Sequence, residues 1–116
     1  MSKRMKRVYL CHEFGGIYDN SKKITENINV LISYNKKSVY ISPILLFGHL
    51  YDKVKYSLYI DYCLSELKTC DIMITFGEDS YSKECMIEKE FCKTHNIPIV
   101  DYIDYCKRYR KGWSHG

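Results

Sequence analysis

The sequence predicts an α/β protein whose mainly parallel sheet is covered by helices on both faces. Short apolar or β-branched runs alternate along the chain with segments in which apolar residues recur every three or four positions. The run from 71 to 76 is almost continuously apolar, which is typical of a strand buried on both faces. With 116 residues and no linker or repeat, the chain is expected to form one domain, 1–116.

Four strands and their connecting helices are expected in alternation. The spacing predicts strands at 7–11, 38–42, 71–76 and 97–100. It predicts a first helix that Asn20 or Ser21 caps and in which apolar residues recur at helical spacing from Ile24 to about Tyr34. A second helix is predicted from about 56 to 69. A further helix is expected from about Ser82 until Asn96 closes it. The stretch 44–55 is predicted as a long loop, and the basic tail from about 104 as a short helix.

Helical crossovers between parallel strands imply right-handed βαβ units. The expected arrangement is a flavodoxin-like three-layer sandwich with strand order 2-1-3-4, with four strands and room for a fifth. In this order strands one and three are neighbours, and a crevice opens at their carboxyl ends. The loops 12–16 and 77–82 are expected to border that crevice.

One residue breaks the amphipathic pattern of the helix after the third strand. On a wheel of about 100° per residue, Glu88 lies in the apolar face, within roughly 60° of Cys85, Phe91 and Cys92. A carboxylate in a crevice can serve as a nucleophile or as a general acid or base, so Glu88 is the candidate catalytic residue. One alternative stays open: a structural Glu88 that pairs with a Lys or Arg or curls to solvent.

Residues of the bordering loops are candidates for substrate binding. Ser80 and Ser82, together with the free N–H groups of the following helix turn, can hold a phosphate or a ribose hydroxyl. Gly15 and Gly16 let the backbone approach a ligand closely. His49 is a further candidate at the pocket mouth, with solvent exposure as the alternative.

Composition and charge argue against several other classes. No run approaches the roughly 20 apolar residues of a membrane span, and no signal peptide is recognised, so cytoplasmic residence is expected. Much of the net charge of +4 lies in 3–7 and 107–111, interpreted as solvated ends, and nucleic-acid binding is not expected. The six cysteines form no CxxC motif and no His-x₃-His motif accompanies them. Buried free thiols are therefore favoured, and no metal site is predicted.

Four stretches between about residues 7 and 100 carry a resemblance to a known family. They are VYLCHEFGG, YISPILLFGHLYD, YCLSELKTCDIMITFG, and Ser82 six residues before Glu88 followed by EFCKTHNIPIV. In order and spacing they resemble the nucleoside 2-deoxyribosyltransferase-like superfamily, in particular its short phage and Gram-positive bacterial members of unassigned function.

The resemblance implies a flavodoxin-like fold. It also implies an enzyme that breaks the N-glycosidic bond of a deoxynucleoside or deoxynucleotide, by hydrolysis or by transfer of the deoxyribosyl group. Glu88 matches the family's nucleophile, and Ser82 matches the serine that contacts a 5′-phosphate. His12, Phe14 and Gly15 lie in the loop that lines the base and sugar. No dissociable cofactor is implied. A homodimer or higher homo-oligomer whose partner completes the pocket is implied.

Two positions depart from the family pattern. Glu84 replaces a glycine near the phosphate site, and Cys63 replaces the aspartate that protonates the leaving base in many members. The nearest carboxylate, Asp61, lies about 200° away on the wheel. Asp71, which also matches the family, is expected to cap or turn. The alternative function is therefore a catalytically weak or inactive nucleotide-binding protein of a phage or mobile element, which sequesters a ligand or binds a host protein. A third possibility is a structural interaction domain.

Overall fold

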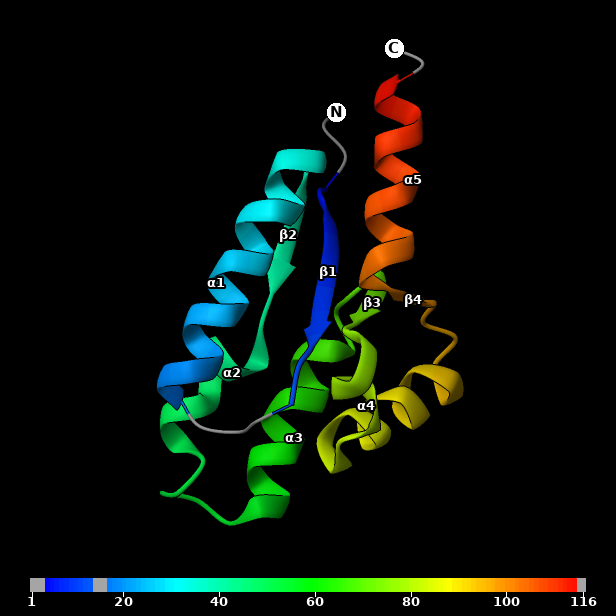
Figure 1. Cartoon of the computed structure of the whole chain (residues 1–116). Coiled ribbons are helices and arrows are strands. Elements are labelled where there is room, and N and C mark those ends of the chain that lie inside the picture. Colours follow the sequence, from blue (N-terminus) through cyan, green and yellow to red (C-terminus); the bar gives the residue numbers. More distant parts are fainter. Residues whose placement is uncertain (1–3, 14–16, 115–116) are drawn as a thin grey trace.

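The computed structural model describes residues 4–13 and 17–114 and confirms the predicted fold class. Four strands form one parallel sheet in the order β2-β1-β3-β4 (Figure 1). They are β1 (Lys6–Cys11), β2 (Ser38–Ile41), β3 (Ile72–Thr75) and β4 (Ile99–Asp101). Val8 of β1 pairs with Tyr40 on one side and Ile72 on the other, so β1 and β3 are neighbours as expected.

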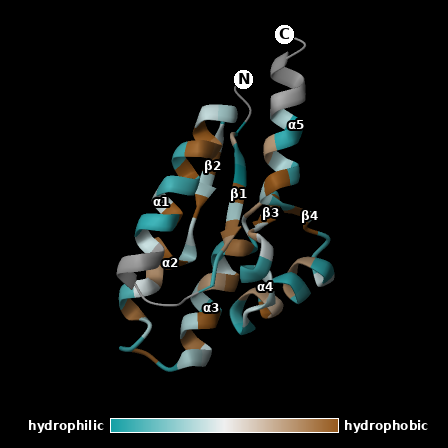
Figure 2. Cartoon of the chain, viewed as in Figure 1, coloured by the Kyte–Doolittle hydropathy of each residue, from teal (hydrophilic) through white to brown (hydrophobic). Residues whose placement is uncertain are grey.

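Helices connect the strands. The longer ones are α1 (Ile17–Tyr34), α3 (Tyr56–Leu67), α4 (Lys83–Thr94) and α5 (Tyr102–Ser114). Shorter helical segments are α2 (Pro43–Phe47) and the 3-10 turns η1 (Gly48–Leu50) and η2 (Gly77–Tyr81). Figure 2 shows hydrophobic and hydrophilic bands alternating along α1 and α5, as expected of helices that cover a sheet with one side. No helix in the described ranges is long and apolar enough to cross a membrane.

The alternation of side chains along β1 divides the core into two layers. Tyr9 and Cys11 point to the layer under α3 and α4, whereas Val8 and Leu10 point to the layer under α1 and α5. The buried residues of the first layer are Tyr9, Cys11, Ile41, Leu67, Cys70, Met73, Cys85 and Cys92. Those of the second are Val8, Leu10, Leu31, Ile74, Tyr105 and Cys106. The expected three-layer sandwich is therefore present.

Some predicted boundaries were wrong. α1 begins at Ile17, so Asn20 and Ser21 lie within the helix and the predicted cap there is wrong. A helix can extend through polar turns that a periodicity signal misses. The stretch 44–55 is partly helical rather than a loop: the Ser42 hydroxyl accepts a hydrogen bond from Leu45 N at 3.3 Å and caps α2. α5 begins at Tyr102 and runs for 13 residues, and β4 is shifted to Ile99–Asp101.

Two residues with positive φ angles, Gly77 and Asn96, shape the β3–α4–β4 unit. Gly77, directly after β3, has a φ of +52°, a conformation that glycine adopts without a side-chain penalty. Asn96 has a φ of 57°, and the N–H of Ile97 donates to the carbonyl of Cys92 at 2.9 Å. Asn96 therefore closes α4 as predicted, through the left-handed conformation that asparagine tolerates best among residues with a side chain.

Candidate functional site

Helix α4 places Glu88 inside the protein, over the carboxyl half of β1. The side chain of Glu88 is 3% exposed, and the hydroxyl of Tyr9 donates a hydrogen bond to its carboxylate. The ion pairs among the described residues do not include Glu88. The alternative in which Glu88 pairs with a Lys or Arg, or curls to solvent, is therefore wrong.

Burial raises the pKa of Glu88 to about 8, because an ionised carboxylate loses its hydration inside the protein. The hydrogen bond from Tyr9 opposes this shift, and the nearby carboxylate of Glu84 adds to it. At neutral pH Glu88 is mainly a carboxylic acid, and it becomes half charged only near pH 8. A strongly raised pKa of a carboxyl group is a common feature of functional sites.

Tyr9 and Cys63, two groups beside Glu88, stay neutral across the physiological range. Burial, followed by the charge of Glu88, raises the pKa of Tyr9 well above its usual value. The same two causes raise the pKa of the Cys63 thiol to about 12. Asp61, the nearest carboxylate in the sequence of α3, is exposed. Neither Cys63 nor Asp61 is thus placed as an acid for a leaving group, which agrees with the departure seen in the sequence.

His12 lies directly after β1 and is buried, with its ring stacked on Phe76 at a centroid distance of 3.8 Å. Its Nε2 is 3.1 Å from the side-chain nitrogen of Asn27, which can only donate, so the hydrogen-bond pattern puts the ring proton on Nδ1. Nδ1 makes no hydrogen bond with any described residue. Burial lowers the pKa of His12 to about 4. His12 is therefore a neutral ring whose buried Nδ1 donor has no partner among the described residues.

The loops after β1 and β3 meet, as the topology predicts. The N–H of Glu13 donates to the carboxylate of Asp79 in η2 at 3.3 Å, and Lys23 of α1 forms an ion pair with Asp79 at 3.2 Å. Phe14, Gly15 and Gly16, three of the predicted binding residues, lie outside the described residues. The described part of the first loop is thus held against η2.

The remaining predicted binding residues lie in two segments: Ser80 and Ser82 precede α4, and His49 lies in η1. Ser80 is buried in η2, and Ser82 directly precedes α4. His49 lies in η1 and is exposed, the alternative that the sequence had left open. Ser82 acts as the N-cap of α4, since its hydroxyl accepts a hydrogen bond from Cys85 N at 3.2 Å. The structure brings Ser80 and Ser82 to the start of the helix that carries Glu88.

Removing the cap of α4 should weaken the fold. Ser82→Ala is expected to lower the free energy of unfolding by about 1 kcal/mol, because Cys85 N loses its hydrogen-bond acceptor. Urea denaturation measures the change. Ser65→Ala is the matched control: Ser65 is exposed within α3, and its replacement should stay within about 0.5 kcal/mol of the parent. Equal stabilities of the two variants would contradict the capping role.

The cysteine prediction is correct in part. Cys63, Cys70, Cys92 and Cys106 are buried free thiols, as expected. Cys11 and Cys85, however, form a disulfide with their Cα atoms 5.8 Å apart. The pairing was not visible in the sequence because the two residues are 74 positions apart and meet only when α4 packs on β1. The disulfide occupies both sulfur atoms, so they are not available as thiolate ligands for a metal.

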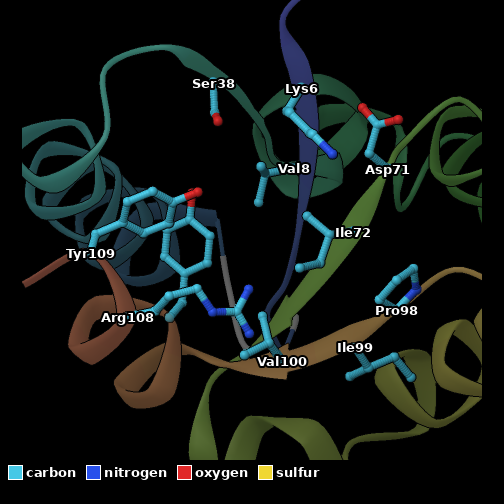
Figure 3. Close-up of a pocket in the computed structure, with 11 residues that line it drawn as sticks. Lys6, Val8, Ser38, Asp71, Ile72, Pro98, Ile99, Val100, Arg108 and Tyr109 are labelled. Atoms are coloured by element: carbon cyan, nitrogen blue, oxygen red, sulfur yellow. The ribbon is translucent and has the colours of Figure 1, made fainter. Parts of the chain in front are cut away.

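A cavity of about 260 Å³ lies at the opposite, amino-terminal edge of the sheet. Figure 3 shows Lys6 of β1 and Arg108 of α5 beside it. Asp71, which also lines it, accepts hydrogen bonds from the Arg4 side chain and from the Arg7 backbone, so its contacts there are structural. None of the predicted site residues lines this cavity.

Tyr9 is the site residue that sequence reasoning missed. Its signal was present: in strand 7–11, Tyr9 and Cys11 alternate onto one face, and the helix carrying Glu88 was expected to cover a face of the sheet. What the sequence could not show was that Tyr9 and Glu88 would lie at the same height along the sheet. This depends on the position along β1 at which α4 packs.

Fold and site together define an α/β protein of flavodoxin-like strand order with a buried, hydrogen-bonded carboxyl group beside two adjacent strands. Comparison with protein-family models and with curated proteins finds no match for this chain.

Proposed function

We propose that the protein cleaves or transfers at the N-glycosidic bond of a deoxynucleoside or deoxynucleotide, with Glu88 as the nucleophile. The observation that carries the proposal is the position of Glu88, a buried carboxyl group held by Tyr9 beside the adjacent strands β1 and β3. In open α/β sheets ligands bind at such a switch point. The motif resemblance, which assigns the same residue to the same role, supports the proposal independently.

The chemistry proceeds in two steps. The Glu88 carboxylate attacks the anomeric carbon, the bond to the base breaks, and the base leaves with the bonding electrons and takes a proton from water. Water or a second base then cleaves the glycosyl ester. The first step requires the charged form of Glu88, and its pKa of about 8 means that the rate should rise as pH approaches 8. His12 Nδ1 provides a neutral donor for a base or sugar oxygen.

The alternative function, a nucleotide-binding protein with little or no turnover, has observations of its own in its favour. Glu88 is 3% exposed and mostly protonated at neutral pH, and the aspartate that would protonate a leaving base is replaced by the buried Cys63. Glu84 accepts a hydrogen bond from Tyr56 at 2.7 Å, which keeps a carboxylate near the α4 start. That charge disfavours a 5′-phosphate there, so an unphosphorylated nucleoside is the preferred ligand.

A substrate panel tests the proposal. The protein is incubated at pH 8 with deoxynucleosides and their monophosphates, with and without a second base, and free base is measured by chromatography. Release of base that Glu88→Gln lacks would support the enzyme. Binding of a nucleoside, seen as a rise in melting temperature, without base release would favour the alternative. The homodimer that the resemblance implies stays a prediction, which sedimentation would check.

The hydrogen bond from Tyr9 should set the pH at which the protein works. Because this bond lowers the pKa of Glu88, Tyr9→Phe is expected to move the midpoint of the rate-against-pH profile upward by about one pH unit. The rate constant kcat/KM measured between pH 6 and pH 10 gives this midpoint.

Tyr105→Phe is the matched control for this variant. Tyr105 is also buried and its hydroxyl lies 3.0 Å from that of Tyr40, but it packs on the other face of the sheet. Its replacement should leave the midpoint in place. The same upward shift in both variants would mean that a general loosening, not the Tyr9 bond, controls the profile.

A further inference from the structure

Two sulfur atoms lie next to the carboxyl group of Glu88. Cys11 ends β1, Cys85 lies in the first turn of α4, and the disulfide between them is fully buried. Both sulfur atoms and a carboxylate oxygen of Glu88 lie within 4.8 Å of one another. A bond that can change its oxidation state is therefore in the immediate surroundings of the candidate nucleophile.

The oxidised and reduced forms of the Cys11–Cys85 pair differ in the number of hydrogen-bond donors that they present to the Glu88 carboxylate. A disulfide sulfur carries no hydrogen and cannot donate, whereas each thiol has one S–H donor. A hydrogen bond donated to a carboxylate favours its charged form. In the oxidised structure the hydrogen bond to Glu88 from a described residue comes from Tyr9. The other titratable groups that act on Glu88 are Tyr56, Tyr59 and Cys63 from α3 and Glu84 and Cys92 from its own helix.

We propose that Cys11 and Cys85 are a reversible dithiol–disulfide pair, and that their reduced thiols act as positioning groups that favour the charged form of Glu88. Reduction takes two electrons: a small dithiol breaks the S–S bond, passes its two protons and two electrons to the protein sulfurs, and closes into its own cyclic disulfide. The consequence for turnover rests on the proposed function, since a charged Glu88 is the attacking form. The effect on the charge of Glu88 itself does not involve a substrate.

The test measures the charge of Glu88 without any substrate. The free energy of unfolding is determined against pH for the protein and for Glu88→Gln, and the difference between the two reports the titration of Glu88. Oxidised and reduced samples are compared in a buffer that contains a chelator, and alkylation of the unfolded chain establishes the state of the pair. We expect the pH at which the difference levels off to fall by about one pH unit on reduction. An unchanged pH, or failure of Cys11 and Cys85 to pair under an oxidant, overturns the proposal.

Two double variants separate the S–H donors from the covalent link. Cys11→Ala with Cys85→Ala has no donor in either condition, so it should level off at the pH of the oxidised protein with or without a dithiol. Cys11→Ser with Cys85→Ser supplies hydroxyl donors and should level off at the pH of the reduced protein without any dithiol. If the alanine variant instead behaves like the reduced protein, release of the link is sufficient and the proposal is overturned.

Should the serine variant not fold, the alanine variant and the parent protein still decide the question. The outcome is also distinguishable from that of the proposed function. An absence of base release from every substrate would reject the enzyme, while the dependence of the Glu88 charge on the Cys11–Cys85 pair would still be measured.

Discussion

Replacing Glu88 with Gln is expected to lower the rate of base release by about a thousandfold or more, because an amide cannot replace a carboxylate nucleophile. Gln keeps the length of the side chain, and its oxygen can still accept the hydrogen bond from Tyr9. The loss should therefore appear in the chemical step rather than in binding. Chromatography of free base at pH 8, with the nucleoside in excess, measures the rate.

Glu90→Gln controls for the loss of a negative charge from the same helix. Glu90 is exposed on α4, two residues from Glu88, and its replacement should leave the rate within about twofold of the parent. Binding of the nucleoside to Glu88→Gln, followed as a shift in melting temperature, should be retained. Base release by Glu88→Gln at close to the parent rate would exclude Glu88 as the nucleophile.

The same substitution should change how stability depends on pH. Glu88 has a pKa of about 8 in the folded protein and about 4.5 in the unfolded chain, so between these values the folded state holds more protons. Its stability therefore falls as pH rises through this range, by up to about 1.4 kcal/mol per pH unit. Relative to Glu88→Gln, the parent protein should lose roughly 3 kcal/mol between pH 5 and pH 8. Urea denaturation over this range measures the difference.

His12 gives the opposite sign and does not interfere with this comparison. Its pKa is lowered to about 4 in the folded protein, so its contribution to stability is lost as pH falls from about 6.5 to 4. The contribution is the same in the parent and in Glu88→Gln and cancels in the difference. A pH-independent difference for Glu88→Gln would show that Glu88 keeps an ordinary pKa when folded.

Much of the fold could be predicted because it depends on patterns local to each segment. Alternating strands and crossover helices imply a parallel sheet, and the order 2-1-3-4 was confirmed. Ser82 as a cap and Asn96 as a helix end follow from side-chain chemistry within one turn. The first helix and the 44–55 stretch were less predictable, because α1 extends beyond its apolar repeats and α2 is a short turn held by Ser42.

The candidate site was predictable in part. A helical wheel is enough to place Glu88 on the apolar face, since the angle between residues of one helix does not depend on the rest of the chain. That its partner is a tyrosine rather than a Lys or Arg depends on which strand lies beneath α4 and at what height. Likewise, His49 belongs to a segment whose exposed conformation is set by the packing of α2 and η1.

The sequence by itself determined the α/β class, the strand order and the place of Glu88 on the apolar face of the helix after the third strand. These properties depend on the periodicity of apolar residues, which can be read from residues close together in the sequence. Only the tertiary structure decided that Tyr9 donates to Glu88, that Cys11 and Cys85 join, and that burial raises the pKa of Glu88 to about 8. Each of these depends on residues more than 70 positions apart that meet only when α4 packs on β1, and such distances are set by the packing of the whole domain.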